Sequence, residues 1–301
     1  MNTQFLSWLM LPLLVLSAGC PSGGGGDGGL EGGVPVAYVI SSGSPPEVQA
    51  YTFSETTGAL TVVGSPVALA AAPTAMTVSF NSTFAYVTLN QATNNVLAFT
   101  VNSATGELTP VSGSPFDAGA NPTAVTTSPN GRFLYVANSN GVVSAFMISG
   151  TTGALTAVTG PFNAGTIPSG IAVSPDNTFL YVSNQGSNDV SAFTIDGTTG
   201  ALTPVAGTFN AGTTPSGVAV SPNGSFLYVS NQGSNNVSAF SIDGATGALT
   251  ALGTSPFGAG TSPSGVAASP NGSFLYVSNQ GSSNVSAFTI AGGGRIVAAG
   301  N

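Results

Sequence analysis

The sequence predicts an all-β fold, a β-propeller built from six blades of four antiparallel strands each. The main observation is a Tyr-Val dipeptide that closes a hydrophobic run six times, at intervals of 46 to 49 residues, at Tyr38, Tyr86, Tyr135, Tyr181, Tyr228 and Tyr276. A repeat of about 40 to 50 residues is typical of one propeller blade. The second observation is the abundance of turn formers, 42 glycines and 20 prolines, which short strands joined by tight turns require.

One copy, from Pro215 to Ser262, shows the strands of a blade in order. The first run contains small and β-branched residues, the second is apolar on both faces, and polar loops and glycine turns set off the others, so that the four runs are 215–221, 226–229, 237–242 and 248–252. Ser221-Pro222-Asn223-Gly224 suits a type I turn between the first two strands. Sheets that are apolar on both faces need cover on both sides, which radial packing supplies. A parallel β-helix is the main alternative, but its coils are about half as long.

The two ends of the array leave ring closure undecided. The first copy begins at its second strand, Val36 to Ile40, and the sixth ends after its third strand, Val285 to Ile290. The remaining run, Arg295 to Ala299, can supply either the inner strand of the first blade or the outer strand of the last. We expect a six-bladed ring, with a seven-bladed type of propeller that is truncated or incompletely closed as the alternative.

The N-terminal residues predict the cellular localisation of the protein. Residues 1–19 are expected to be a lipoprotein signal peptide, residues 20–33 a lipidated Cys20 with a glycine-rich tether, and residues 34–301 the propeller domain. The apolar run from Phe5 to Ala18 is too short to span a bilayer, and Ser17-Ala18-Gly19-Cys20 resembles the lipobox of bacterial lipoproteins. Cys20 is the only cysteine, although an ordinary secretory signal with an incidental cysteine is the alternative. We expect a protein anchored by lipid in the bacterial cell envelope, on the periplasmic or surface face of the outer membrane, and not in the cytoplasm.

Charge excludes one large class of partners. The net charge is −8, and the two basic residues are Arg132 and Arg295, with no histidine in the chain. Such a surface repels phosphate backbones, so nucleic acid binding is excluded. Neither a metal site nor a cofactor is predicted, because no cluster of ligand-type residues stands out in the sequence.

Three short motifs carry a family resemblance. The run Ser-Pro-Asn-Gly-Arg-Phe-Leu-Tyr-Val-Ala-Asn at 128–138, with Val-Ser-Ala-Phe at 143–146 and Thr-Gly-Ala-Leu-Thr at 152–156, resembles the YVTN-type β-propeller repeat. More specifically, it is similar to the lactonase family of propellers, which includes bacterial 6-phosphogluconolactonases and fungal carboxymuconate lactonising enzymes. The resemblance covers residues 34 to 290 and implies a propeller, usually seven-bladed and cytoplasmic, with a cluster of His, Arg and Glu near the central channel. This sequence offers no position for that cluster.

The residues themselves give little support for catalysis. A nucleophilic serine without histidine or lysine lacks its base, and Arg132 is expected in a turn that faces away from the Asn-Gln loops. Glu47, Asp117 and Asp189 should share one end of the ring, but they come from three different blades. No catalytic residue is therefore predicted, and catalysis is disfavoured without being ruled out.

The favoured function is a non-catalytic interaction or structural module whose partner is an envelope protein or a glycan. Polar loops between the second and third strands would form its binding face, with Asn184, Gln185, Asn188, Asn231, Gln232, Asn235, Asn279 and Gln280 as candidates. Polar residues are expected in turns in any case, however, and hairpin closure alone is the favoured explanation of these loops. The alternative function is a lactonase-like hydrolase that acts on a neutral lactone through carboxylates. A carbohydrate binder is a third possibility, weakened because the only tryptophan, Trp8, lies in the signal peptide.

Overall fold

The computed structural model describes residues 13–17, 35–54 and 56–299, and in this part it confirms the predicted all-β fold. The strands of these residues form six antiparallel sheets, and the only helix among them is a 3₁₀ turn, η1 (Gly292–Gly294). No helix in the described ranges is long and apolar enough to cross a membrane. The predicted lipid-attachment residue Cys20 and its tether lie outside the described residues.

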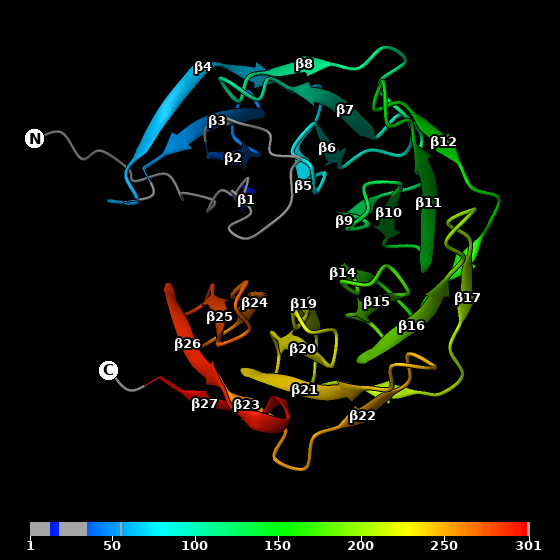
Figure 1. Ribbon diagram of the computed structural model, residues 1–301, viewed down its shortest axis with the longest axis vertical. Helices are drawn as coiled ribbons and strands as arrows, with labels where there is room; N and C mark the ends of the chain where they lie inside the picture. The colour runs from blue at the N-terminus through cyan, green and yellow to red at the C-terminus, as the bar shows by residue number, and fades with distance from the viewer. Residues whose placement is uncertain (1–12, 18–34, 55, 300–301) are drawn as a thin grey trace, which may run out of the picture.

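Each sheet is one blade, and its strands follow one another along the chain from the central channel outward (Figure 1). Blade 1 contains β1 (Leu13–Ser17), β2 (Val36–Ser41), β3 (Glu47–Phe53) and β4 (Leu60–Ala68). Blade 2 contains β5 (Pro73–Val78), β6 (Phe84–Leu89), β7 (Val96–Val101) and β8 (Leu108–Pro110). Blade 3 contains β9 (Pro122–Thr127), β10 (Phe133–Asn138), β11 (Val142–Ile148) and β12 (Leu155–Ala157).

The second half of the ring repeats this order. Blade 4 contains β14 (Pro168–Val173), β15 (Phe179–Asn184), β16 (Asp189–Ile195) and β17 (Leu202–Pro204). Blade 5 contains β19 (Pro215–Val220), β20 (Phe226–Asn231), β21 (Asn236–Ile242) and β22 (Leu249–Ala251). Blade 6 contains β24 (Pro263–Ala268), β25 (Phe274–Asn279), β26 (Asn284–Ile290) and β27 (Ile296–Ala298). Short fifth strands, which the sequence did not predict, pair with the third strands of blades 3, 4 and 5: β13 (Phe162–Asn163), β18 (Phe209–Asn210) and β23 (Phe257–Gly258).

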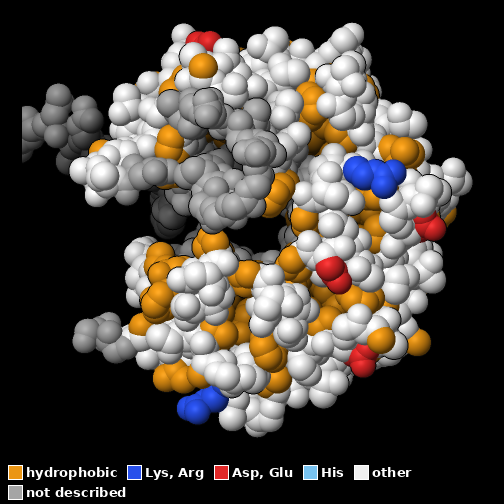
Figure 2. Space-filling view, in the orientation of Figure 1, with side chains coloured by type: hydrophobic (Ala, Val, Ile, Leu, Met, Phe, Trp, Pro, Cys, Tyr) orange, Lys and Arg blue, Asp and Glu red, His pale blue; other side chains and the backbone are white. Residues whose placement is uncertain are grey.

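The blades stand around a central channel, and the ring is open on one side. The inner strands β5, β9, β14, β19 and β24 lie side by side in that order. Figure 1 shows blades 1 and 6 on either side of the opening, and Figure 2 shows the hollow at the centre of the molecule. The incompletely closed ring that the sequence left as an alternative is therefore the form observed here.

The first and last blades are completed by strands of different origin. The C-terminal run supplies the outer strand of the last blade, because β27 pairs with β26 and Ile296 stands opposite Ile290. The inner position of blade 1 is taken by β1, which pairs with β2. Since β1 belongs to the predicted signal peptide, removal of that peptide would leave blade 1 with three strands.

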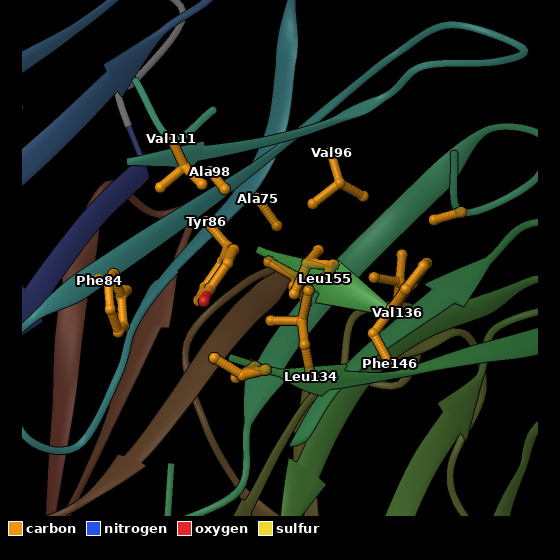
Figure 3. Packing of buried hydrophobic residues seen from close by; sticks show 13 residues of the cluster. Ala75, Phe84, Tyr86, Val96, Ala98, Val111, Leu134, Val136, Phe146 and Leu155 are labelled. Atoms are coloured by element: carbon orange, nitrogen blue, oxygen red, sulfur yellow. The ribbon is translucent and has the colours of Figure 1, made fainter. Parts of the chain in front are cut away.

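Neighbouring blades share a dry interface that repeats around the ring. We call the face of a blade that carries the repeat tyrosine its forward face, because it packs on the next blade, and the opposite face its rear face. Between blades 2 and 3, for example, Phe84 and Tyr86 pack against Leu134, Val136 and Phe146 (Figure 3). Equivalent clusters join each of the other successive pairs. The aromatic positions of the repeat are thus core residues, as the alternation of apolar residues predicts.

Candidate functional site

The predicted binding loops lie between the second and third strands of blades 4, 5 and 6, at one end of the ring. Three of the predicted residues in them are buried: Asn184, Asn231 and Asn279. The Asn184 side-chain amide donates to Asp189 Oδ1 at 2.7 Å and to Ser191 Oγ at 2.9 Å. Its Oδ1 accepts a hydrogen bond from the Gly165 backbone N–H at 3.1 Å. The other two asparagines make matching bonds, so all three hold their loops in shape and have no amide group left for a ligand.

Two further predicted residues join neighbouring blades. Asn188 Oδ1 accepts the backbone N–H of Thr214, and Asn235 Oδ1 accepts that of Ser262, both at 2.7 Å. Both asparagines have positive φ, 59° and 55°, which asparagine tolerates better than most residues. Ser283 stands at the corresponding place in blade 6, where no seventh blade follows within the described residues.

The remaining predicted residues are Gln185, Gln232 and Gln280, whose side chains are half-exposed or exposed. These glutamine amides are accessible to a ligand, as are the exposed Nδ2 groups of Asn188 and Asn235, which make no hydrogen bond among the described residues. Whether they bind one stays a prediction.

Hydroxyl groups on the inner strands form a second polar feature, which the sequence analysis did not single out. Each donates to the carbonyl of the proline that opens the next blade: Thr123 to Pro168 at 2.8 Å, Ser169 to Pro215 at 2.7 Å and Ser216 to Pro263 at 3.0 Å. The Pro-Ser or Pro-Thr that opens the inner strands of blades 2 to 6 was the signal for it. These bonds tie the blades together around the channel.

Asp189 is the one acidic residue in three nearly identical loops. Asn236 and Asn284 take its place in the loops of blades 5 and 6. Its Oδ1 accepts hydrogen bonds from Asn184 Nδ2 at 2.7 Å and from Ser187 Oγ at 2.8 Å. Among the described residues, its Oδ2 receives no hydrogen bond, and the side chain is half-exposed. One carboxylate oxygen is thus held in a fixed position with no protein donor.

The other two carboxylates expected at this end stand in other blades. Glu47 is the first residue of β3. Asp117 lies between β8 and β9, and its Oδ1 accepts the backbone N–H of Gly119 at 2.9 Å. That bond leaves the buried Oδ1 of Asn138 without a partner, whereas the equivalent asparagines of blades 4 to 6 accept a glycine N–H. In the described part of the chain, no three His, Cys, Asp or Glu residues come together in a way that could hold a metal ion.

Charged residues also stand at the opposite end of the ring. As predicted, Arg132 faces away from the Asn-Gln loops: its Nη1 donates to the Gly197 carbonyl at 2.8 Å, and its guanidinium lies 5.4 Å from the centre of the Phe133 ring. In the same turn as Gly197, the backbone N–H groups of Thr199 and Thr198 lower the pKa of the Asp196 carboxyl. Neither Arg132 nor Asp196 can therefore serve a ligand at the loops.

Two cavities lie apart from these loops. One of about 180 Å³ sits between blades 1 and 2 and is lined by Val48, Val63 and Glu107 among others. The other, of about 480 Å³, lies at the end of the ring opposite the loops, beside Asp176 and Asn223. Both carboxylate and amide accept hydrogen bonds from neighbouring hydroxyls, so these side chains are already engaged there.

Comparison with known proteins decides the family. The model of the family described as "Lactonase, 7-bladed beta-propeller" matches residues 37–159 and 152–257. The chain belongs to this lactonase family. The resemblance inferred from the repeat motifs is confirmed, and family membership favours the hydrolase alternative over a non-catalytic module. No curated protein matches the chain significantly.

Solved structures agree on the fold. The periplasmic gluconolactonase of Pseudomonas aeruginosa has a TM-score of 0.73 against this protein, with 22% identity over 88% of this chain and 81% of that one. A protein of Bacteroides uniformis, named as a candidate 6-phosphogluconolactonase, has a TM-score of 0.71 and 24% identity over 88% and 82% of the two chains. At this level of identity the likeness shows the fold alone.

Proposed function

We propose that the protein is a lactonase that hydrolyses an uncharged lactone, such as that of a sugar acid, at the end of the ring with the Asn-Gln loops. The observation that carries the proposal is the family match over residues 37–257. The alternative, non-catalytic binding of an envelope protein or glycan, draws support from the accessible glutamines of the same loops. We further propose that lipidated Cys20 anchors the protein in the cell envelope.

The charge distribution supports a neutral substrate. Binding a phosphate or a carboxylate favours arginine or lysine, and the chain has two basic residues in all. Arg132 is engaged at the opposite end, and Arg295 precedes the outer strand of blade 6. With a net charge of −8, the protein also repels anions at a distance. A phosphorylated lactone is therefore expected to be a poor substrate.

Asp189 is the residue we propose as the general base. In the proposed reaction its Oδ2 takes a proton from water while the water oxygen attacks the carbonyl carbon of the lactone. The acyl–oxygen bond of the ring then breaks, the ring oxygen takes the proton that Asp189 had accepted, which restores the carboxylate, and a hydroxy acid leaves. The bonds from Asn184 and Ser187 hold the carboxylate in place for this step, as general base catalysis requires.

The test is acid release from glucono-lactone and from 6-phosphogluconolactone by the purified protein. We expect turnover of the uncharged lactone well above its spontaneous hydrolysis, and its loss in Asp189→Asn. Asparagine occurs naturally at this place in blades 5 and 6, so the substitution should preserve the loop. Asp196→Asn, at the opposite end of the ring, is the matched control and should keep full activity. Absence of turnover by the unaltered protein would overturn the proposal, and undiminished turnover by Asp189→Asn would remove Asp189 from it.

A further inference from the structure

The same hydrogen bond closes every boundary between successive blades. The hydroxyl of the repeat tyrosine donates to the carbonyl of a glycine in the turn between the third and fourth strands of the next blade. The five pairs are Tyr38 to Gly106 at 2.7 Å, Tyr86 to Gly153 at 3.0 Å, Tyr135 to Gly200 at 3.1 Å, Tyr181 to Gly247 at 3.1 Å and Tyr228 to Gly294 at 2.9 Å. We call this contact the tyrosine latch. All five tyrosines are fully buried.

Each latch glycine also receives an apolar side chain. The ring of Phe133 lies so close to Gly200 that a Cβ there would collide with it, and Phe179 fills the same place at Gly247. Phe84 and Phe226 do so at Gly153 and Gly294, and Val36 replaces the ring at Gly106. A side chain at the glycine would exclude this neighbour. All five latch glycines also have positive φ, between 74° and 81°, which favours glycine.

Blade 6 presents one half of this latch with nothing to receive it. On its forward face Phe274, Tyr276 and Val285 are 37%, 44% and 63% exposed, although their counterparts in blades 3 and 4 are buried. Among the described residues, the Tyr276 hydroxyl makes no hydrogen bond. Figure 2 shows hydrophobic side chains along this side of the opening.

Blade 1 presents the other half, already formed. Gly58 occupies the latch position with φ of 70°, and its N–H donates to the Ser54 carbonyl at 2.7 Å, as Gly153 does to Ser149 at 2.8 Å. Apart from its own chain neighbours, no atom of the described residues lies within 4 Å of the place where a Cβ on Gly58 would stand. Leu60, which follows it on the rear face, is 50% exposed, whereas Leu155 of blade 3 is 8% exposed.

We propose that the ring closes on itself, with blade 6 docking on blade 1 of the same chain and Tyr276 donating to the Gly58 carbonyl. The proposal extends an interface that occurs five times in the molecule to the one boundary that lacks it. It is independent of the lactonase activity proposed above.

The same chain is the occupant that the geometry favours. A second copy that offered its blade 1 would also bring its blade 2, which packs on blade 1, into the space that the first copy's blade 1 occupies. The two halves of a latch also meet at a much higher effective concentration when they belong to one chain than when they belong to separate molecules. Propellers form with about four to eight blades from the same kind of interface, so the repeat tolerates the change in angle between blades. Because Ser283 lacks the amide of Asn188 and Asn235, this boundary would depend on the latch and the apolar faces.

The first test is nitration of tyrosine in the purified monomer, mapped by mass spectrometry. A closed ring protects Tyr276 as fully as the buried Tyr181. Gly58→Val should abolish that protection, because its side chain would fill the latch, while Tyr181 stays protected. Gly131→Val is the matched control, since Gly131 has a similar φ of 68° with open space around it but no tyrosine partner, and Tyr276 should stay protected in it. Ready nitration of Tyr276 in the unaltered monomer would overturn the proposal, and so would protection confined to a dimer.

A second test is a disulfide across the latch in a Cys20→Ser background. Phe274→Cys with Gly58→Cys should close within one chain, as the control pair Phe179→Cys with Gly247→Cys should at an existing boundary. The expected result is a monomeric protein with one intramolecular disulfide in each case, read by non-denaturing size and by mass. A control pair that closes while the test pair stays reduced, or links two chains, would contradict ring closure.

Discussion

The tyrosine latch leads to a sharp prediction about stability. Tyr181→Phe removes only the hydroxyl that donates to the Gly247 carbonyl at 3.1 Å and keeps the buried ring in place. The loss of a buried hydrogen bond, with a carbonyl left unpaired, costs about 1 to 2 kcal/mol in the free energy of unfolding. For a domain of this size that corresponds to a fall in Tm of roughly 2 to 8 °C, since each kcal/mol shifts Tm by about 2 to 4 °C.

The assay is urea unfolding followed by far-ultraviolet circular dichroism, because the described residues contain no tryptophan. Tyr51→Phe is the matched control: Tyr51 is half-exposed, and its hydroxyl makes no hydrogen bond among the described residues, so we expect a change within about 0.5 kcal/mol. Equal stabilities of the two variants, with unchanged dependence on urea, would refute the idea that the latch holds the blades together.

Three further predictions follow from the same structure. Burial raises the pKa of Tyr228 to about 12 and raises the pKa of the other four latch tyrosines as well, so the folded protein keeps protons that the unfolded chain releases above pH about 10. The free energy of unfolding should therefore be constant up to that pH and fall as pH rises toward 12. The fall should be at most about 1.4 kcal/mol per pH unit for each tyrosine. Unfolding curves that do not change between about pH 9 and about 11.5 would contradict this prediction. Gly200→Ala should destabilise by more than about 1 kcal/mol, because it meets the Phe133 ring at a φ of 76°, whereas Gly197→Ala in the same turn has open space and should be almost neutral in thermal unfolding. Cys20→Ser should move the protein from the membrane fraction to the soluble fraction of cells, and its persistence in membranes would exclude the lipid anchor.

The repeat made most of the fold predictable. In the copy from Pro215 to Ser262, all four strands were placed from apolar runs and glycine turns, and the structure places β19 to β22 there. The short strands such as β23 were missed because two residues of the run Pro-Phe-Gly give no periodicity. Closure could not be read from the sequence, since Arg295 to Ala299 suited either end of the array. The outcome depends on which sheet edge the segment reaches. It follows directly after Gly294, which the last latch holds against blade 5, and it therefore pairs with β26.

The candidate site was harder to predict, because polar residues in a turn serve two purposes. Asn184 and Gln185 are neighbours in one loop, yet the first is buried and fully bonded and the second is half-exposed. Nothing in the order of the residues separates them: the difference arises because the Gly165 N–H from the preceding segment reaches one side chain and not the other. Sequence reasoning also treated Asp189 as one of several scattered carboxylates, since its bonds to Asn184 and Ser187 become apparent only in the folded loop.

In a molecule built by repetition, departures from the repeat carry more information about function than the repeat itself. A residue that recurs in every blade, such as Tyr181 with its bond to Gly247, is explained by packing that every blade needs. Asp189 has no such explanation, because asparagine at the same place in blade 5 makes the same two bonds to its loop. The loop therefore does not need a negative charge for its structure, and placing one there without a basic partner has an electrostatic cost in a protein of net charge −8. A carboxylate that the fold of its loop does not require is a candidate for a reacting group, and for this reason Asp189→Asn tests function at little cost to stability.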